Sequence, residues 1–289
     1  MKKKLTIGMA TSDDFDGVFF TTQSIRIANR DRLDEIEILI IDNKPGSPEG
    51  KATREHARKI GARYHPEKEW RSTAIRDLVF KFSKAEWVLC MDPHVLVEPG
   101  TIARILEFAE HNPGSRDLYA GGLFYDNLGN GVATNMKPQW RSQMFGTWEH
   151  QPRGQNPDAC PFEIPLHGLG LFMSRREAWQ GFNPLFLGFG GEEGYIHQKF
   201  RNAGARTMFL PWLRWNHRFA RPRAVPYSLK IQERISNYFI GWKETGQDVQ
   251  DIHDHFSGTN KGLDIKAIEK EVDQLLEMDS EDALKRRRA

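Results

Sequence analysis

The sequence predicts an α/β fold in which a mostly parallel sheet is flanked by helices, and three observations predict it. Short apolar runs alternate with segments of helical periodicity through the first third of the chain. Strands that alternate with helices form parallel sheets with right-handed crossovers. Polar clusters follow three of the apolar runs, at the end of the strand where such sheets bind ligands. The 289 residues suffice for a large domain with its own core.

The expected elements of this first third follow in order from the amino terminus. We expect strands over residues 5–10, 37–41, 63–65 and 86–91, and helices over 23–29, 52–61, 72–83 and 101–111. The strand EILII ends in the turn-forming run 42–46, DNKPG. Gly61 is typical of a helix end.

The second half of the chain is less regular. Residues 119–165 are rich in Gly, Asn, Gln, Pro and Trp, which indicates extended and loop structure over the sheet. Strands are expected over 168–174 and 207–215, with a helix over 192–203. We place a first domain at residues 1–222 and a mostly helical C-terminal extension at residues 223–289.

The extension contains three segments of different character. Residues 236–256 are interpreted as a lid or an acceptor-side element. A helix after residue 264 is expected to pack on the domain or on a partner through an apolar face formed by Ile265, Ile268, Val272, Leu275 and Leu276. The basic run 285–288 is expected to be a solvated, frayed terminus.

Composition excludes some classes of protein. Hydrophobic residues make up 39% and charged residues 28%, a globular balance, and the formal net charge of +2 gives no global attraction to nucleic acid or membrane. Two cysteines, Cys90 and Cys160, form no disulfide framework. The apolar stretch after the basic start is too short for a membrane span or a signal-peptide core, so we expect a cytoplasmic protein with no membrane partner.

Polar clusters lie where three expected strands end: residues 11–14, residues 42–43 and Asp92-Pro93-His94. A carboxylate and an imidazole two residues apart can share one divalent cation, and mixed oxygen and nitrogen ligation suits Mn²⁺, Fe, Co or Zn better than Ca²⁺. For this short motif alone, an Asp-Pro turn beside a surface histidine is the favoured explanation.

Two further motifs follow along the chain. In the segment 188–193, GFGGEE, glycines permit a tight turn and close approach to a ligand, and Glu192 and Glu193 then open a helix. Helix capping accounts for one acidic residue but not for the glycines. His217 lies in the segment WNHRF after an expected strand, and packing among aromatic residues is the simpler explanation unless the fold brings it to Asp92 and His94.

Taken in order, these motifs resemble those of GT-A glycosyltransferases, most closely the polypeptide N-acetylgalactosaminyltransferases and related family-2-like enzymes. The resemblance covers residues 4–219 and rests on MDPH, NPLFLGFGGEEGYIHQKFRNAG and WNHRF. It implies a GT-A, Rossmann-like fold. It also implies that Asp92, His94 and His217 hold a divalent metal, with Mn²⁺ favoured and Mg²⁺ as the alternative.

The resemblance extends to the nucleotide and the reacting groups. It implies that Thr11 and Asp42 contact the base and ribose, and that Arg76 and Gly191 lie against the nucleotide-sugar. Where relatives have Gly-Glu-Asn or Gly-Glu-Asp, this chain has Gly-Glu-Glu. Glu193 matches the general base of inverting relatives, and Glu192 matches the acid that contacts donor or acceptor; with retention of configuration, either would position the substrates.

The function implied is a metal-dependent glycosyltransferase (hexosyltransferase) that uses a nucleotide-sugar donor, with UDP as the expected nucleotide. The acceptor, the donor sugar and the oligomeric state stay open: a saccharide, a protein or a hydroxymethylated base in viral DNA would each serve as acceptor. The DNA hypothesis rests on arginines and aromatics interleaved over residues 212–234, although closure of this strip over the donor diphosphate explains it more simply.

Two other classes remain as alternatives. A nucleotidyltransferase on a related fold predicts a basic, glycine-rich loop after the first strand, where this chain has the acidic run TSDDF. A non-catalytic nucleotide-sugar-binding module would keep the fold without needing all three metal candidates and both glutamates.

His253 and His255 flank Asp254. A structural role is favoured for both histidines, with His255 as a reserve metal ligand.

Overall fold

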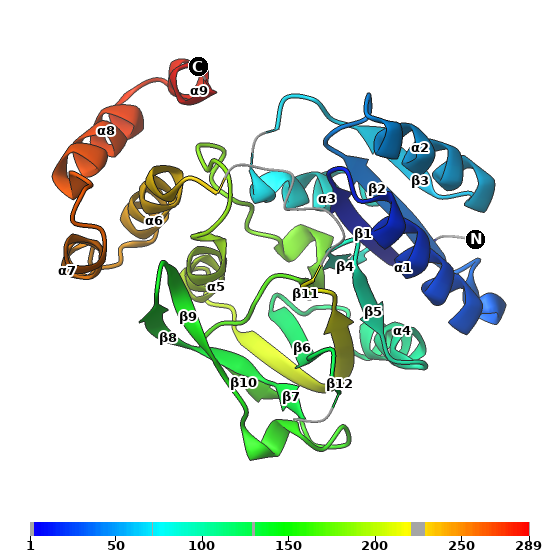
Figure 1. The fold of residues 1–289 in the computed structure, drawn as a ribbon. Helices are drawn as coiled ribbons and strands as arrows, with labels where there is room; N and C mark the ends of the chain where they lie inside the picture. Colours follow the sequence, from blue (N-terminus) through cyan, green and yellow to red (C-terminus); the bar gives the residue numbers. More distant parts are fainter. Residues whose placement is uncertain (1–2, 71, 129–130, 221–228, 289) are drawn as a thin grey trace.

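A mixed, mostly parallel sheet forms the centre of the protein in a computed structural model that describes residues 3–70, 72–128, 131–220 and 229–288 (Figure 1). Its strand order is β3-β2-β1-β4-β11-β6-β12-β10, with β5 paired to β12 and β7 to β6. The strands are β1 (Leu5–Thr11), β2 (Ile36–Asp42), β3 (Arg63–Pro66), β4 (Trp87–Met91), β5 (Val95–Val97), β6 (Leu118–Phe124), β7 (Val132–Ala133), β10 (Phe162–Glu163), β11 (Leu171–Arg175) and β12 (Thr207–His217). A separate hairpin joins β8 (Asn135–Arg141) to β9 (Met144–Glu149). The predicted α/β fold class is confirmed.

The direction of the strands decides where the site lies. Strand β1 pairs in parallel with β2 and β4, and β2 pairs in parallel with β3, so the carboxyl ends of these four strands share one edge of the sheet. Strand β11 runs antiparallel between β4 and β6, while β6 and β12 are parallel to each other. Thr11 and Asp42 are register partners at the ends of β1 and β2.

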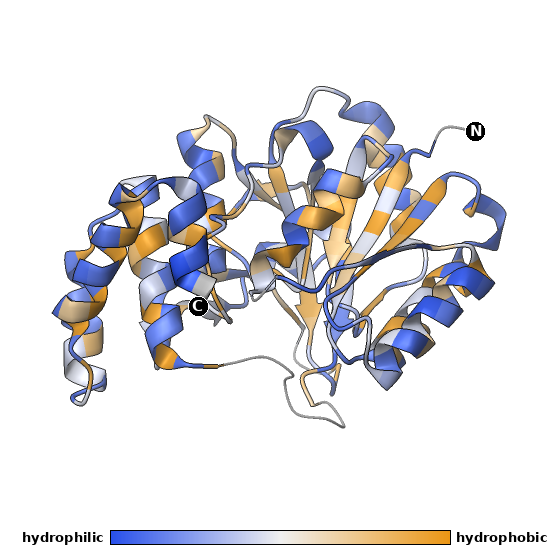
Figure 2. Ribbon diagram, turned by 90° about the horizontal axis from the view of Figure 1, so that it is seen from above, coloured by the Kyte–Doolittle hydropathy of each residue, from blue (hydrophilic) through white to orange (hydrophobic). Residues whose placement is uncertain are grey.

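Helices cover both faces of this sheet. They are α1 (Phe15–Ala28), α2 (Pro48–Ile60), α3 (Asp77–Phe82), α4 (Thr101–His111), α5 (Glu192–Asn202), α6 (Ile231–Thr245), α7 (Gln250–Thr259), α8 (Ile265–Glu277) and α9 (Ser280–Arg288), with 3₁₀ turns η1 (Arg30–Arg32), η2 (Thr73–Arg76), η3 (Pro152–Gly154) and η4 (Arg176–Ala178). Apolar side chains of α1, α2 and α4 pack on one face of the strands, and those of α3, α5 and α6 pack on the other. The apolar residues of the central strands therefore lie between two layers of helices (Figure 2).

Local chemistry explains most element boundaries. Helix α2 begins at Ser47, whose hydroxyl accepts from the Gly50 amide, and ends at Gly61 in the left-handed region (φ 70°). Helix α1 starts at Phe15, eight residues before the expected start, because the Asp14 carboxylate caps it by accepting from the Gly17 amide. The helix expected over 72–83 is a 3₁₀ turn that continues into α3.

The helices after residue 230 share a hydrophobic cluster with the sheet domain. Phe239 of α6 and Val272 and Leu275 of α8 are buried in the same cluster as Tyr195 and Phe200 of α5. The amphipathic helix predicted after residue 264 is thus present as α8, and it packs within the chain. Figure 1 shows α6 beside α5 and the β8–β9 hairpin, with α7 and α8 outside it.

The segment interpreted as a lid or an acceptor-side element, 236–256, forms most of α6 and α7, and its role stays a prediction. One expectation for this region was wrong. The expected frayed terminus is helical in α9, and the Arg287 Nε–H donates to the Leu185 carbonyl at 3.0 Å. Among the described residues, the helices all lack the combination of length and apolarity that crossing a membrane requires.

Candidate metal and donor site

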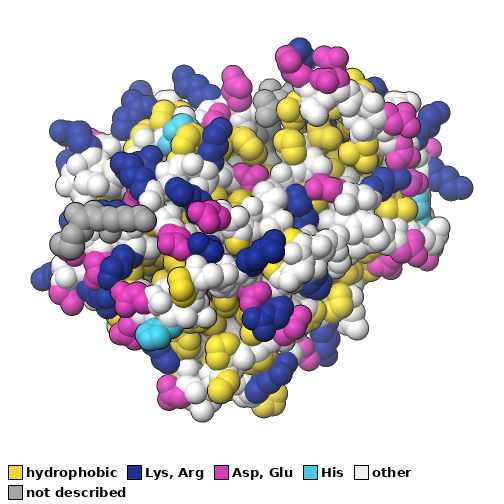
Figure 3. All heavy atoms as spheres, turned by 180° about the vertical axis from the view of Figure 1, so that it is seen from behind, with side chains coloured by type: hydrophobic (Ala, Val, Ile, Leu, Met, Phe, Trp, Pro, Cys, Tyr) yellow, Lys and Arg dark blue, Asp and Glu magenta, His cyan; other side chains and the backbone are white. Residues whose placement is uncertain are grey.

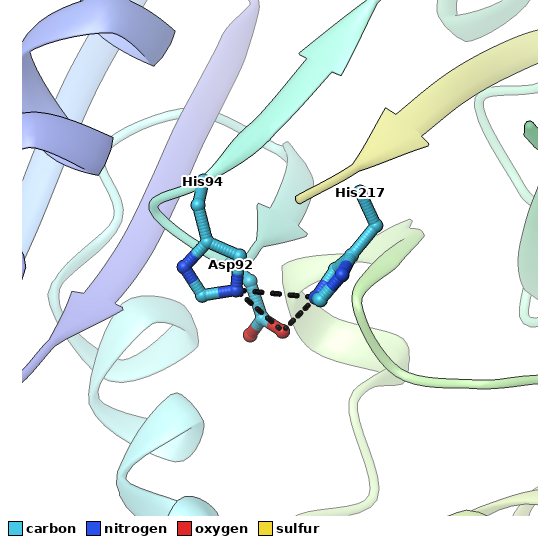
Figure 4. Close-up of side chains that lie close together, drawn as sticks. All are labelled: Asp92, His94 and His217. Atoms are coloured by element: carbon cyan, nitrogen blue, oxygen red, sulfur yellow. Dashed lines mark hydrogen bonds and ion pairs between the residues drawn. The ribbon is translucent and has the colours of Figure 1, made fainter. Parts of the chain in front are cut away.

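Asp92, His94 and His217 meet at the carboxyl edge of the sheet (Figure 4). Asp92 follows β4 directly, and His94 precedes β5. His217 is the last residue of β12, and the antiparallel pairing of β5 with β12 sets Val95 opposite it. Residues that lie more than 120 positions apart in sequence are therefore brought together by strand pairing.

The three side chains offer one ligand atom each to a common point. His94 Nε2 lies 3.1 Å from His217 Nε2, His217 Nε2 lies 3.4 Å from Asp92 Oδ2, and His94 Nε2 lies 3.9 Å from the same oxygen. Metal–ligand bonds of about 2.1 Å place neighbouring ligands about 3–3.5 Å apart. Two imidazole nitrogens and a carboxylate oxygen suit a divalent transition-metal ion, so the residues fit such an ion.

Asp14 orients one of these ligands, although the sequence analysis considered it only as part of a polar cluster. Its Oδ2 lies 2.7 Å from His94 Nδ1. Burial raises the pKa of Asp14, but the bond to His94 and its charge, the Gly17 amide and the charge of Arg218 together outweigh burial, and the pKa lies below its usual value. An ionised carboxylate only accepts, so Nδ1 carries the proton and Nε2 presents its lone pair to Asp92 and His217. The signal that could have identified Asp14 is its place in the polar cluster after the first strand, at the same edge of the sheet as the Asp-x-His motif.

Arg76 connects the three side chains to the glycine-rich segment. Its Nη2–H donates to Asp92 Oδ1 at 3.1 Å. Burial lowers the pKa of Arg76, but the carboxylates of Asp92 and Glu192 raise it above its usual value. Burial likewise raises the pKa of Asp92, and Arg76 and the two histidines reverse this, so Asp92 is ionised. The predicted nucleotide-contacting arginine thus contacts Asp92 and lies within the electrostatic influence of Glu192.

Glu192 and Glu193 open α5 directly after Gly191, which caps the helix with φ 98°. Glu192 is buried; its Oε2 accepts from the Gly190 amide at 2.8 Å, and its Oε1 has no hydrogen-bond partner among the described residues. Burial raises the pKa of both carboxyl groups, and the charge of Glu193 raises that of Glu192 further. Two adjacent acids with elevated pKa values are typical of a catalytic centre.

Thr11 and Asp42 lie at the same edge of the sheet, on the strands next to β4. Thr11 is buried, and within the part of the chain that the structure describes its hydroxyl has no hydrogen-bond partner. Asp42 is buried and accepts from the Tyr64 hydroxyl at 2.7 Å and from the Lys44 amide at 2.9 Å. Tyr64 therefore joins Asp42 at the position where the sequence predicted base and ribose contacts.

His253 and His255 lie away from this edge. His253 Nε2 contacts Glu269 Oε2 at 2.7 Å. His255 stacks on Trp140 with ring centroids 4.4 Å apart, and its Nε2 lies 2.6 Å from the Ser142 carbonyl oxygen. Both contacts agree with the structural role favoured for these histidines, and neither ring reaches the three metal candidates.

The described arginines of the basic segment 212–234 donate to other groups of the protein and do not form one exposed basic surface. Arg214 donates to the Gln155 carbonyl, Arg218 to Asp14 Oδ1 at 3.3 Å, and Arg234 to the Phe189 carbonyl at 3.0 Å. Arg221, Arg223 and Tyr227 lie outside the described residues. On the face seen in Figure 3, basic and acidic side chains are interspersed. These contacts favour an internal role for the described arginines over contact with DNA.

A cavity of about 560 Å³ lies elsewhere, at the amino ends of the strands. It is lined by residues that begin β2 and β3, among them Ile36 and Arg63, with Lys84 before β4. Ligands of such sheets bind at the opposite edge, where Asp92 lies. The candidate site described above lies at that carboxyl edge.

Comparison with known proteins assigns the class of protein. Residues 21–181, more than half of the chain, match the family described as glycosyl transferase family 2. The chain belongs to this family and is a glycosyltransferase. No curated protein matches the sequence significantly.

Solved structures show the same fold. The chain is similar to GalNAc-T7, in a structure with UDP, GalNAc and Mn²⁺, at 16% identity and a TM-score of 0.65; the match covers 92% of this chain and 54%, about half, of that one. It is also similar to S. aureus TarS 1–349 in complex with UDP-GlcNAc, at 12% identity and a TM-score of 0.57, over 90% of this chain and 74% of that one. A second structure of TarS 1–349 gives a TM-score of 0.54. The GT-A fold expected from the sequence is confirmed.

Proposed function

We propose that this glycosyltransferase moves a hexose-type sugar from a UDP-sugar to an acceptor hydroxyl and depends on a divalent metal. The observation that carries the proposal is the convergence of Asp92, His94 and His217 beside Arg76, Glu192 and Glu193. UDP with Mn²⁺ in the GalNAc-T7 structure, and UDP-GlcNAc in the TarS structure, support the choice of donor.

Asp92, His94 and His217 would hold the metal, with Mn²⁺ preferred and Mg²⁺ as the alternative. Such an ion, when bound, neutralises charge on the diphosphate leaving group. Asp14 fixes the ring of His94, and Arg76 holds Asp92 in its ionised form. Thr11 and Asp42 would contact the base and ribose, and Gly191 permits close approach of the nucleotide-sugar.

Glu193 is the proposed general base. Its carboxylate removes the proton of the acceptor hydroxyl as the acceptor oxygen bonds to the anomeric carbon, and the bond from that carbon to the diphosphate oxygen breaks with its electron pair leaving on UDP. Glu192, whose pKa is raised further by its neighbour, stays protonated and contacts donor or acceptor. This assignment applies to inversion; with retention, both carboxyl groups position the substrates instead.

The test is turnover of UDP-sugars with Mn²⁺, first without an acceptor and then with saccharide, protein and hydroxymethylated-DNA acceptors. We expect slow donor hydrolysis by the wild type and loss of transfer in Glu193→Gln. Glu177→Gln, at a largely exposed position, is the matched control and keeps full activity. Binding of UDP without any turnover across the panel would instead identify a nucleotide-sugar-binding module.

A further inference from the structure

The segment between Leu187 and Gly191 has no regular secondary structure, although it leads directly into the two catalytic candidates. Gly188, Gly190 and Gly191 have φ values of 58°, 108° and 98°, which other residues adopt with strain. Backbone amides and carbonyls in such a segment require partners from elsewhere in the fold. One comes from η2, where the Thr73 amide donates to the Gly188 carbonyl at 3.1 Å.

Asn237 of α6 supplies several of the other partners. Its Oδ1 accepts from the Leu187 amide at 3.0 Å. Its Nδ2 donates to the Leu187 carbonyl at 2.7 Å and to the Gly190 carbonyl at 2.9 Å. The side chain is fully buried, so water does not replace these three hydrogen bonds. One amide side chain thus contacts both ends of the segment.

Arg234 lies one helical turn earlier on the same face of α6. Its Nε–H donates to the Phe189 carbonyl at 3.0 Å, and its guanidinium lies over the Phe189 ring, 5.6 Å from the centroid. A Cβ at Gly190 would lie 2.6 Å from Arg234 Nε. A Cβ at Gly191 would lie 3.0 Å from Asn237 Cβ. The glycines are therefore required for contact with α6 as well as for the turn.

The same face of α6 also holds the neighbouring hairpin. The Phe145 amide of β9 donates to the Tyr238 hydroxyl at 2.8 Å. Phe145 in turn lies against Gly194 of α5, 3.1 Å from the position of a Cβ there. Behind α6, Phe239 belongs to the cluster that contains Val272 and Leu275 of α8. Helix α6 is thus a rigid element that contacts the segment and the hairpin together.

We propose that Asn237 and Arg234 are positioning residues, through which α6 fixes the backbone of residues 187–191 and so the carboxyl groups of Glu192 and Glu193. The C-terminal helices then belong to the catalytic apparatus, and the segment 236–256 contributes to it as a fixed support. The catalytic part of this inference rests on the proposed function; the structural part does not.

The structural part is tested by amide hydrogen exchange of the peptide 186–194. We expect exchange in Asn237→Leu to be at least about tenfold faster than in the wild type, because the partners of three backbone groups are lost. Asn237→Asp keeps an acceptor for the Leu187 amide and removes both donors, so its exchange should be intermediate. Asn29→Asp is the control, since Asn29 is a buried residue that donates to a helix carbonyl at the far end of α1.

The catalytic part is tested by kinetics and by UDP binding in the same variants. We expect kcat to fall about 100-fold in Asn237→Asp, as for a small misplacement of a catalytic group. The KM for donor and Mn²⁺-dependent UDP binding should stay unchanged, because the described residues of α6 form no hydrogen bond to Asp92, His94 or His217. Arg234→Lys should keep more activity than Arg234→Met.

The outcomes separate the two proposals. Unchanged exchange in Asn237→Leu, or equal acceleration in Asn29→Asp, would overturn the positioning role. Faster exchange with normal kcat would restrict α6 to a structural role and overturn its catalytic part. If the wild type turns over no donor, the proposed function fails, while the exchange experiment still decides whether α6 holds the segment.

Discussion

Asp14 Oδ2 and His94 Nδ1 lie 2.7 Å apart, and this contact joins the cap of the first helix to the metal candidates at the end of β4. The Asp14 carboxylate also accepts from the Gly17 amide and from Arg218, so three parts of the chain meet around one carboxyl group. A carboxylate behind a metal-binding histidine orients its ring and fixes the position of its proton. Affinity for the metal should therefore depend on a residue that does not touch it.

Asp14→Ser is expected to weaken Mn²⁺ binding about 10- to 100-fold, because serine keeps the helix cap but no longer reaches the imidazole as an anion. Calorimetric titration of Mn²⁺ in the presence of UDP measures the change. Asp16→Ser, in the exposed first turn of the same helix, is the control and should bind as the wild type does. Equal affinity in Asp14→Ser would show that the contact does not orient His94.

The pH dependence of kcat should report the base. Burial raises the pKa of the Glu193 carboxyl above its usual value of 4.5, and the charge of Asp92 raises this pKa as well. The charges of Arg76 and Arg234 act in the opposite direction. A base acts only when ionised, so kcat should rise with pH through a midpoint above 4.5. Arg234→Met removes a cation and should move this midpoint to higher pH. A midpoint at or below 4.5 would contradict the raised pKa of Glu193.

Gly190→Ala should lower the free energy of unfolding by about 1–3 kcal/mol, since φ is 108° and the new methyl group meets Arg234. Urea unfolding measures the change. Gly114→Ala is the matched control, because nothing lies within 4 Å of its Cβ position. Similar losses in both variants would indicate that α6 does not crowd the segment.

Asp77 is expected to make stability depend on pH. Burial raises its pKa from 3.8 to about 6, although Trp179 Nε1 and the Phe182 amide donate to it. The folded state therefore binds the proton more tightly than the unfolded state, and stability is lost as pH rises from about 4 through 6. Between pH 4.5 and 7.5 the wild type should lose about 2 kcal/mol relative to Asp77→Asn. Parallel pH profiles for the two proteins would contradict this.

Local signals in the sequence predicted much of the fold. The helix expected at 101–111 has those bounds, and the strand expected at 37–41 extends by one residue at each end, because hydrophobic periodicity and turn residues define them. The three ordered motifs also identified residues that strand pairing brings together. The early start of α1 was missed, since Asp14 was considered only as part of a polar cluster.

The support of the glycine-rich segment could not be predicted. Asn237 lies 50 residues from Leu187, and nothing in the local pattern of α6 shows which neighbours its side chain contacts. Tyr64, which donates to Asp42, was missed for the same reason. Such contacts depend on how helices and strands pack, and periodicity within one element does not define that packing.

The proposed metal site is tested by calorimetric titration of UDP, with and without Mn²⁺, on the wild type and on His217→Ala. We expect binding to the wild type that requires Mn²⁺ and is lost in His217→Ala, because His217 completes the group with Asp92 and His94. Metal-independent binding, or binding that survives in His217→Ala, would contradict the proposed metal site. Failure of every nucleoside diphosphate to bind with any divalent metal would contradict the donor site itself.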